Sequence, residues 1–134
     1  MAIARSRGAL IGTDETTGVT LANNGTAYTN AGSVTTDIDM LGDDKSIGDV
    51  WLYVVFTSTV TAGTLDLTIS SHRNTALGYV KTNPDVQIAP INGTQKIPLG
   101  KRPCERYLAV KALNNATGAN ITNLSVLYTL EKLS

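Results

Sequence analysis

The sequence predicts an all-β domain, an antiparallel β-sandwich of roughly eight short strands. Thr, Asn, Ser and Gly supply much of the polarity of a chain that is only 16% charged. Thr favours strands, and Asn and Gly favour turns. Several segments alternate apolar and polar residues with a period of two, which is typical of half-buried strands. No window shows a capped helical period longer than about two turns.

The chain length favours one domain preceded by an arm. A chain of 134 residues fits a single domain. Residues 1–18 show no stable period, and Gly8, Gly12 and Gly18 interrupt them. We therefore expect an extended N-terminal arm over residues 1–18 and a single β-sandwich domain over residues 19–134.

The first strands of the domain are short. Val19–Leu21 is followed by the turn-forming sequence Asn23-Asn24-Gly25, and residues 26–29 form a further candidate strand. Residues 34–40 then alternate between apolar and polar side chains, so one face of that strand is expected to be buried.

The strongest strand signal is residues 50–59, which are rich in β-branched and aromatic residues and apolar on both faces. Such a strand is central and covered on both sides, or has one side facing a partner. After the turn residues Ala62-Gly63, residues 65–70 alternate cleanly between apolar and polar. The two segments predict a β-hairpin.

The remaining strands are separated by breakers. Residues 72–85 are irregular. Two short strands follow, and Pro90 and Pro98 indicate sheet edges because proline cannot donate to a ladder. The remaining strand candidates, in order, are residues 86–89, 95–99, 107–113 (with Leu108 and Val110 inward) and 124–130.

Candidate catalytic and metal-ligating residues lack the partners that they need. His72 follows two serines, but neither a third orienting group nor a Gly-x-Ser-x-Gly elbow accompanies it. Cys104, the only cysteine, excludes an intrachain disulfide, and with one histidine it excludes a Cys/His zinc site. Asp37 and Asp39 would share a strand face where a hard cation could bind, yet Met40-Leu41-Gly42 breaks the EF-hand pattern and favours a solvated strand end. We expect no enzyme, cofactor or metal site.

Charge and hydropathy also limit the partners. The 11 basic residues equal the 11 acidic ones, whereas nucleic-acid binders usually carry a basic excess. The cations near Arg5 and Arg7, and those near Lys101 and Arg106, are interpreted as solvated surface or protein contacts. No stretch approaches the ~18 apolar residues of a membrane span, and the first residues lack the apolar run of a signal peptide. We expect neither nucleic acid nor membrane as a partner.

Three groups of short motifs resemble a known family. The first is Asp37-Ile-Asp39-Met-Leu41, then Ser46-Ile-Gly48 and the apolar strand that contains Trp51-Leu52-Tyr53. The second is Thr61-Ala-Gly-Thr-Leu-Asp-Leu-Thr-Ile-Ser70, and the third is Ile97-Pro-Leu-Gly100 followed by Glu105-Arg-Tyr-Leu-Ala-Val110. Over roughly residues 33–131, the chain resembles the small cement (decoration) proteins of tailed bacteriophage capsids. The insert Lys101-Arg-Pro-Cys-Glu105 departs from the family pattern.

This resemblance implies a fold and a function. The fold is a jelly-roll β-sandwich. The expected function is that of a structural virion protein, made in the host cytoplasm, that sits as a homotrimer on the outer surface of the capsid. Its partner is the major capsid protein, whose neighbouring subunits it cements.

Contact residues follow from the same expectation. Trp51, Tyr53 and Tyr107 are candidate interface anchors, with core packing as the alternative for each, and Arg5 and Arg7 are candidate contacts from the arm. Two other functions stay open: another virion sandwich, such as a tail or receptor-binding module, or a carbohydrate-binding protein. Carbohydrate-binding sheets usually display several aromatic side chains, and only 5% of this chain is aromatic.

Overall fold

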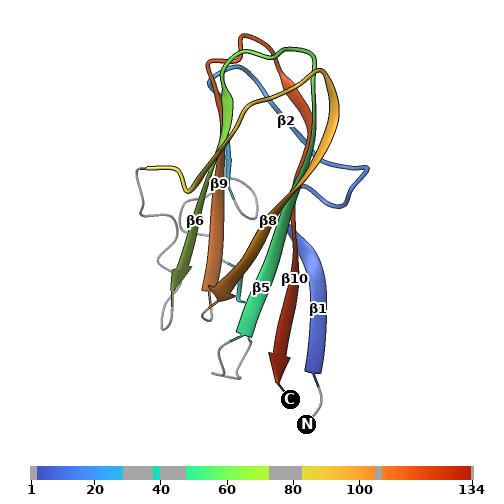
Figure 1. The fold of residues 1–134 in the computed structure, drawn as a ribbon, viewed down its shortest axis with the longest axis vertical. Coiled ribbons are helices and arrows are strands. Elements are labelled where there is room, and N and C mark those ends of the chain that lie inside the picture. Colours follow the sequence, from blue (N-terminus) through green and yellow to red (C-terminus); the bar gives the residue numbers. More distant parts are fainter. Residues whose placement is uncertain (1–2, 29–37, 40–47, 73–82, 105–106, 134) are drawn as a thin grey trace.

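The computed structural model describes residues 3–28, 38–39, 48–72, 83–104 and 107–133, which form two antiparallel sheets packed against each other (Figure 1). The all-β prediction is confirmed: these ranges contain no helix, and so none that is long and apolar enough to cross a membrane. The strands are β1 Ile3–Ile11, β2 Val19–Leu21, β3 Thr26–Tyr28, β4 Ile38–Asp39, β5 Gly48–Ser58, β6 Thr64–His72, β7 Val86–Ile88, β8 Gly93–Cys104, β9 Tyr107–Asn115 and β10 Ile121–Leu133.

The strand order is that of a jelly roll. One sheet, the β5 sheet, has the order β1-β10-β5-β8, and β2 also pairs with β10. The other, the β6 sheet, has the order β3-β9-β6-β7, and β4 also pairs with β9. The pairs β6–β7, β5–β8, β3–β9 and β1–β10 are nested in the sequence, and successive pairs alternate between the sheets. A long antiparallel hairpin rolled up in this way gives the jelly-roll sandwich that the resemblance implied.

The core lies between the sheets and follows the alternation of the strands. On β5, Val50, Leu52, Val54 and Phe56 are at most 2% exposed. They pack in one cluster with the inward residues of the β6 sheet, which include Leu65, Leu67 and Ile69 of β6 and Leu108, Val110 and Ala112 of β9. Because burial of each Val, Leu, Ile or Phe side chain contributes roughly 1.5–3 kcal/mol, this cluster is the main source of stability.

The predicted hairpin between residues 50–59 and 65–70 is wrong. Strand β5 pairs with β10 and β8, whereas β6 pairs with β9 and β7, so the chain crosses from one sheet to the other between them. The turn does contain Gly63, at φ 70°, and a Cβ there would collide with the backbone of Asn115 and Ala116. Both strands have a buried face, and packing these faces against each other buries more apolar surface than a flat hairpin would.

The first residues join the β5 sheet. Residues 1–18 were expected to form an extended N-terminal arm, and within this range Ile3–Ile11 form strand β1. This strand pairs with β10 from Ile3↔Leu133 to Ile11↔Val126, with a bulge after Ala9. The glycines hid this strand: Gly8 lies where a Cβ would overlap the Tyr128 ring, so it is part of the sheet rather than an interruption.

The predicted edge positions of the two strands beside Pro90 and Pro98 are confirmed. Among the described residues, β7 and β8 each end one of the two strand paths. In β8 the register shifts between Pro98, opposite Tyr53, and Gly100, opposite Leu52. Gly100 has φ 84°, which glycine adopts without strain. This bulge and the proline protect an otherwise long edge from further pairing.

Candidate protein-binding face

The outward side of the β5 sheet carries the aromatic residues that the sequence singled out. Strand β5 turns Leu52 into the core, so its neighbours Trp51 and Tyr53 point outward. Trp51 is 45% exposed and Tyr53 is half-buried. The register places Trp51 opposite Lys101, Tyr53 opposite Pro98 and Val55 opposite Lys96 on β8. We call Trp51, Tyr53, Lys96, Pro98 and Lys101 the Trp51 face.

Two lysines lie over the two aromatic rings. The Nζ atom of Lys101 is 5.8 Å from the centre of the Trp51 ring, and that of Lys96 is 5.1 Å from the centre of the Tyr53 ring. Both distances allow cation–π attraction. The aromatic rings are thus flanked by positive charges from the edge strand β8.

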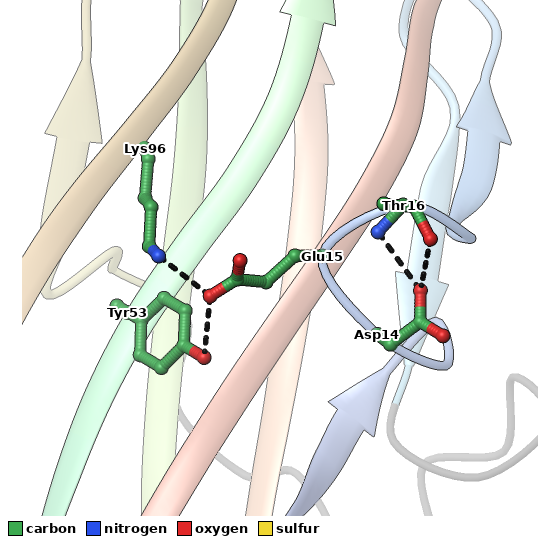
Figure 2. A network of polar contacts seen from close by, with 5 residues as sticks. All are labelled: Asp14, Glu15, Thr16, Tyr53 and Lys96. Carbon is green, nitrogen blue, oxygen red and sulfur yellow. Dashed lines mark hydrogen bonds and ion pairs between the residues drawn. The ribbon is translucent and has the colours of Figure 1, made fainter.

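The loop between β1 and β2 reaches this face. Figure 2 shows the Glu15 side chain extending from the loop toward Tyr53 and Lys96. Glu15 Oε1 accepts a hydrogen bond from the Lys96 ammonium at 2.5 Å and one from the Tyr53 hydroxyl at 3.2 Å. One carboxylate oxygen therefore receives two donors, from β8 and β5.

The loop is braced independently of Glu15. The Asp14 carboxylate accepts hydrogen bonds from the backbone N–H groups of Thr16 and Thr17 and from the Thr16 hydroxyl, at 2.7–2.9 Å. The loop is also fixed to β10, because the Ser125 hydroxyl donates to the Thr17 carbonyl at 3.1 Å. Gly18 N–H donates to the Asn123 side chain at 2.9 Å.

These contacts perturb the acid–base properties of the loop. The hydrogen bonds from Lys96 and Tyr53 hold the pKa of Glu15 below its usual range, and the hydrogen bond to Glu15 raises the pKa of Lys96. The backbone N–H of Thr16, with its hydroxyl, lowers the pKa of Asp14. The Lys96 and Glu15 side chains are 57% and 49% exposed, so water screens their attraction and the contact is easily exchanged.

Two open depressions meet at Tyr53 and Lys96. The larger has a volume of about 600 Å³ and continues past Glu15 to Leu127 and Thr129 of β10. The other, of about 430 Å³, has a largely apolar lining that includes Trp51, Pro98 and Gly100. Tyr53 and Lys96 form the wall that the two share. The surface is therefore shaped to receive protruding side chains or a ring-shaped ligand.

The residues considered for chemistry do not gather into a site. No three His, Cys, Asp or Glu side chains come together to hold a metal ion in the part of the chain that the structure describes. His72 ends β6 opposite Tyr107, and Cys104 ends β8 opposite Gly48, in the other sheet. Asp39 lies in β4 opposite Tyr107, whereas Asp37 is outside the described residues.

The five predicted contact residues divide between the sheets. Trp51 and Tyr53 lie together on the Trp51 face. On β1, Arg7 is opposite Thr129, which in turn is opposite Trp51, so the backbone of Arg7 lies in the same cross-strand row. Arg5 occupies the next such position, opposite Glu131. Tyr107 begins β9 in the β6 sheet and does not belong to this face.

The sequence analysis missed two of the residues at this face, Lys96 and Glu15, and named Lys101 only within a basic cluster interpreted as solvated surface or a protein contact. Lys96 lies close to Pro98 in a strand expected at an edge, and this position could have marked it as an accessible cation. Glu15 gave no sequence signal, because its contact depends on how the loop folds back over β10.

Comparison with known proteins gives no further identification: no family model, no curated protein and no solved structure matches this chain.

Proposed function

We propose that this chain is a structural virion protein that binds the outer surface of a bacteriophage capsid and cements neighbouring subunits of the major capsid protein. One observation carries the proposal. The Trp51-Leu52-Tyr53 motif, through which the sequence resembles capsid cement proteins, directs Leu52 into the core and Trp51 and Tyr53 to the outside of a jelly-roll sheet. Large aromatic residues with an exposed face are the typical anchors of protein interfaces.

The proposal assigns the protein a binding role without catalysis. The Trp51 face combines aromatic rings, a proline and two lysines, which suits contact with a protein surface more than bond-breaking chemistry. A homotrimer would repeat this face three times, and simultaneous contacts would strengthen attachment through avidity. The protein is proposed to assemble onto the outside of the capsid after synthesis in the host cytoplasm.

Capsid binding tests the proposal directly. Purified protein is mixed with capsids that lack it, and the capsids are pelleted. We expect saturable co-sedimentation with the wild type and a loss of at least about tenfold in affinity with Trp51→Ala, as for an interface anchor. Val19→Ala is the matched control, since Val19 is 36% exposed on β2, away from the Trp51 face. Failure of the wild type to co-sediment, or binding to tails alone, contradicts the proposal.

The oligomeric state is tested separately. Gel filtration with light scattering at micromolar concentration is expected to give the mass of three chains. A stable monomer under these conditions contradicts a preformed trimer and leaves the cementing role to be judged by capsid binding.

A second candidate function is carbohydrate binding. The open depression of about 600 Å³ combines the Tyr53 ring with the polar groups of Asp14, Glu15 and Lys96, and exposed Trp51 is adjacent. Aromatic rings beside polar groups are suited to stacking with sugars. A glycan array decides between the two, because the capsid proposal expects no glycan to bind and the alternative expects a hit that Tyr53→Ala abolishes.

A further inference from the structure

The Glu15 carboxylate is held by two hydrogen-bond donors of the Trp51 face. The Lys96 ammonium and the Tyr53 hydroxyl converge on a single oxygen of the Glu15 carboxylate. They come from neighbouring paired strands of the β5 sheet, whereas the carboxylate comes from a loop. We infer that Lys96 and Tyr53 form a carboxylate-binding subsite of the Trp51 face, which Glu15 fills in the isolated chain and an acidic side chain of the partner protein fills in the complex.

Glu15 can leave this subsite without unfolding its loop. The loop is held by the hydrogen bonds of Asp14 with Thr16 and Thr17, and by the contacts of Thr17 and Gly18 with β10. None of these involves the Glu15 side chain. Since the ion pair is about half-exposed on both sides, a competing carboxylate can replace Glu15 by a change of rotamer.

The surroundings define the chemistry of the partner. The largely apolar depression beside Trp51 and Pro98 shares Tyr53 and Lys96 with the subsite. Lys101 adds a second positive charge beside Trp51. A partner segment with an Asp or Glu next to a leucine-sized apolar residue would fit both the carboxylate-binding subsite and the apolar depression. Its carboxylate would bind Lys96, and its apolar side chain would pack against Trp51.

This inference rests on the proposed function for the identity of the partner, but its chemistry can be tested without capsids. The probe is the peptide acetyl-Gly-Leu-Glu-Leu-Gly-amide, with the Glu→Gln peptide as its control. Trp51 is the only tryptophan in the chain, so its emission reports directly on this face. Amide and side-chain NMR shifts provide a second readout at the millimolar concentrations that a short peptide requires.

Removal of the Glu15 carboxylate, which competes with the peptide for Lys96 and Tyr53, should strengthen binding of the acidic peptide. The Glu15→Gln variant is expected to bind the acidic peptide roughly two- to fivefold more tightly than the wild type, because the peptide no longer has to displace an exposed ion pair. The Gln peptide should bind both proteins weakly and equally. Equal affinity of the two proteins for the acidic peptide, or equal binding of the two peptides, contradicts the inference.

Removal of the donors should have the opposite effect. Lys96→Met keeps an unbranched side chain and loses the charge, and Tyr53→Phe loses only the hydroxyl, so both are expected to weaken binding of the acidic peptide. Lys111→Met, on β9 of the other sheet, is the control for loss of a positive charge. If Lys96→Met is misfolded by circular dichroism, Tyr53→Phe still decides the matter, because unchanged peptide affinity in that variant contradicts a role for its hydroxyl.

Capsid binding separates this inference from the proposed function. If the wild type binds capsids and Glu15→Gln and Lys96→Met bind equally well, the subsite is wrong and the proposed function stands. If the acidic peptide binds as expected but neither the wild type nor any variant binds capsids, the subsite stands and the proposed function is wrong.

Discussion

The outer faces of the two sheets contrast with each other. Strand β6 alternates cleanly, and its outward residues Asp66, Thr68 and Ser70 are polar, yet each is at most 7% exposed. Strand β5 is apolar on both sides, yet its outward Trp51 is 45% exposed. These polar residues of β6 are therefore buried, whereas Trp51 of β5 reaches solvent even though Val55, on the same outward side, is only 3% exposed.

The contrast shows that alternation identifies the faces of a strand but not their exposure. The buried Asp66 carboxylate is tolerated because it accepts hydrogen bonds from three side chains, those of Thr64, Gln87 and Asn115. Trp51 is tolerated in water because Lys101 lies over its ring and because a single exposed aromatic adds little to aggregation. The exposed aromatic is the departure from the pattern of the other sheet, and the proposed function rests on it.

The largest expected effect separates the two sides of β5. Phe56→Ala should lower the free energy of unfolding by about 3–5 kcal/mol, because it opens a cavity in the core, whereas Trp51→Ala should lower it by less than about 1 kcal/mol. Urea denaturation followed by circular dichroism measures both. Capsid affinity should show the reverse order, and a Trp51→Ala protein as unstable as Phe56→Ala would mean that Trp51 is a core residue.

The outward faces should respond differently to loss of a polar group. Asp66→Ala removes a buried acceptor and leaves its donors without a hydrogen-bond acceptor, so we expect a loss of about 1–3 kcal/mol in the free energy of unfolding. Thr57→Ala on β5 removes a hydroxyl whose bond to the Thr94 hydroxyl is exposed, and the expected loss is below about 0.5 kcal/mol. Equal losses in the same urea assay would remove the contrast between the faces.

Ser70 offers a smaller test on the β6 sheet. Its hydroxyl is buried and has no hydrogen-bond partner in the described part of the chain. Ser70→Ala should therefore leave the free energy of unfolding unchanged or raise it by up to about 1 kcal/mol. A loss of more than about 1 kcal/mol in thermal or urea unfolding would show that the hydroxyl is bonded after all.

The smallest effect concerns pH and the loop over the Trp51 face. The pKa of Glu15 is lowered in the folded protein, so its contact stabilises the loop above the ordinary glutamate pKa, about 4.3, and is lost as the pH falls through the lowered pKa. The raised pKa of Lys96 means that its contribution persists at neutral pH and is lost only when the pH rises through that value. NMR shifts of the Tyr53 ring should be constant from pH 7 to 5 and change below, and this change should be absent in Glu15→Gln, whereas the Thr16 and Thr17 amides, which bind Asp14, should still shift in that variant.

The sequence predicted strands better than their partners. Alternation and turn residues located β2, β3, β6 and β9 because those signals are local. The hairpin between β5 and β6 was wrong because pairing is decided by which buried faces meet, which the local pattern does not contain. Strand β1 was missed because Gly8 is needed beside the Tyr128 ring, a contact across most of the chain.

The candidate site likewise contains residues that the local sequence pattern identifies and residues that it does not. Trp51 and Tyr53 could be singled out because they stand in a strand that is apolar on both faces. Tyr107 has the same local pattern but belongs to the other sheet. Glu15 could not be found, because only the fold of the loop places its carboxylate between β5 and β8.

The nested pairing also affects how the chain reaches this structure. Ile3 pairs with Leu133, so β1 has no partner until β10 has been synthesised. Of the four nested pairs, only β6–β7 joins strands that follow one another in the chain. Proteins with contacts this distant in sequence fold slowly, in roughly milliseconds to seconds, because each loop closure costs entropy before its contacts form. Until β10 is made, β1 therefore remains an unpaired strand, and unpaired strands are sites at which chains can pair with one another.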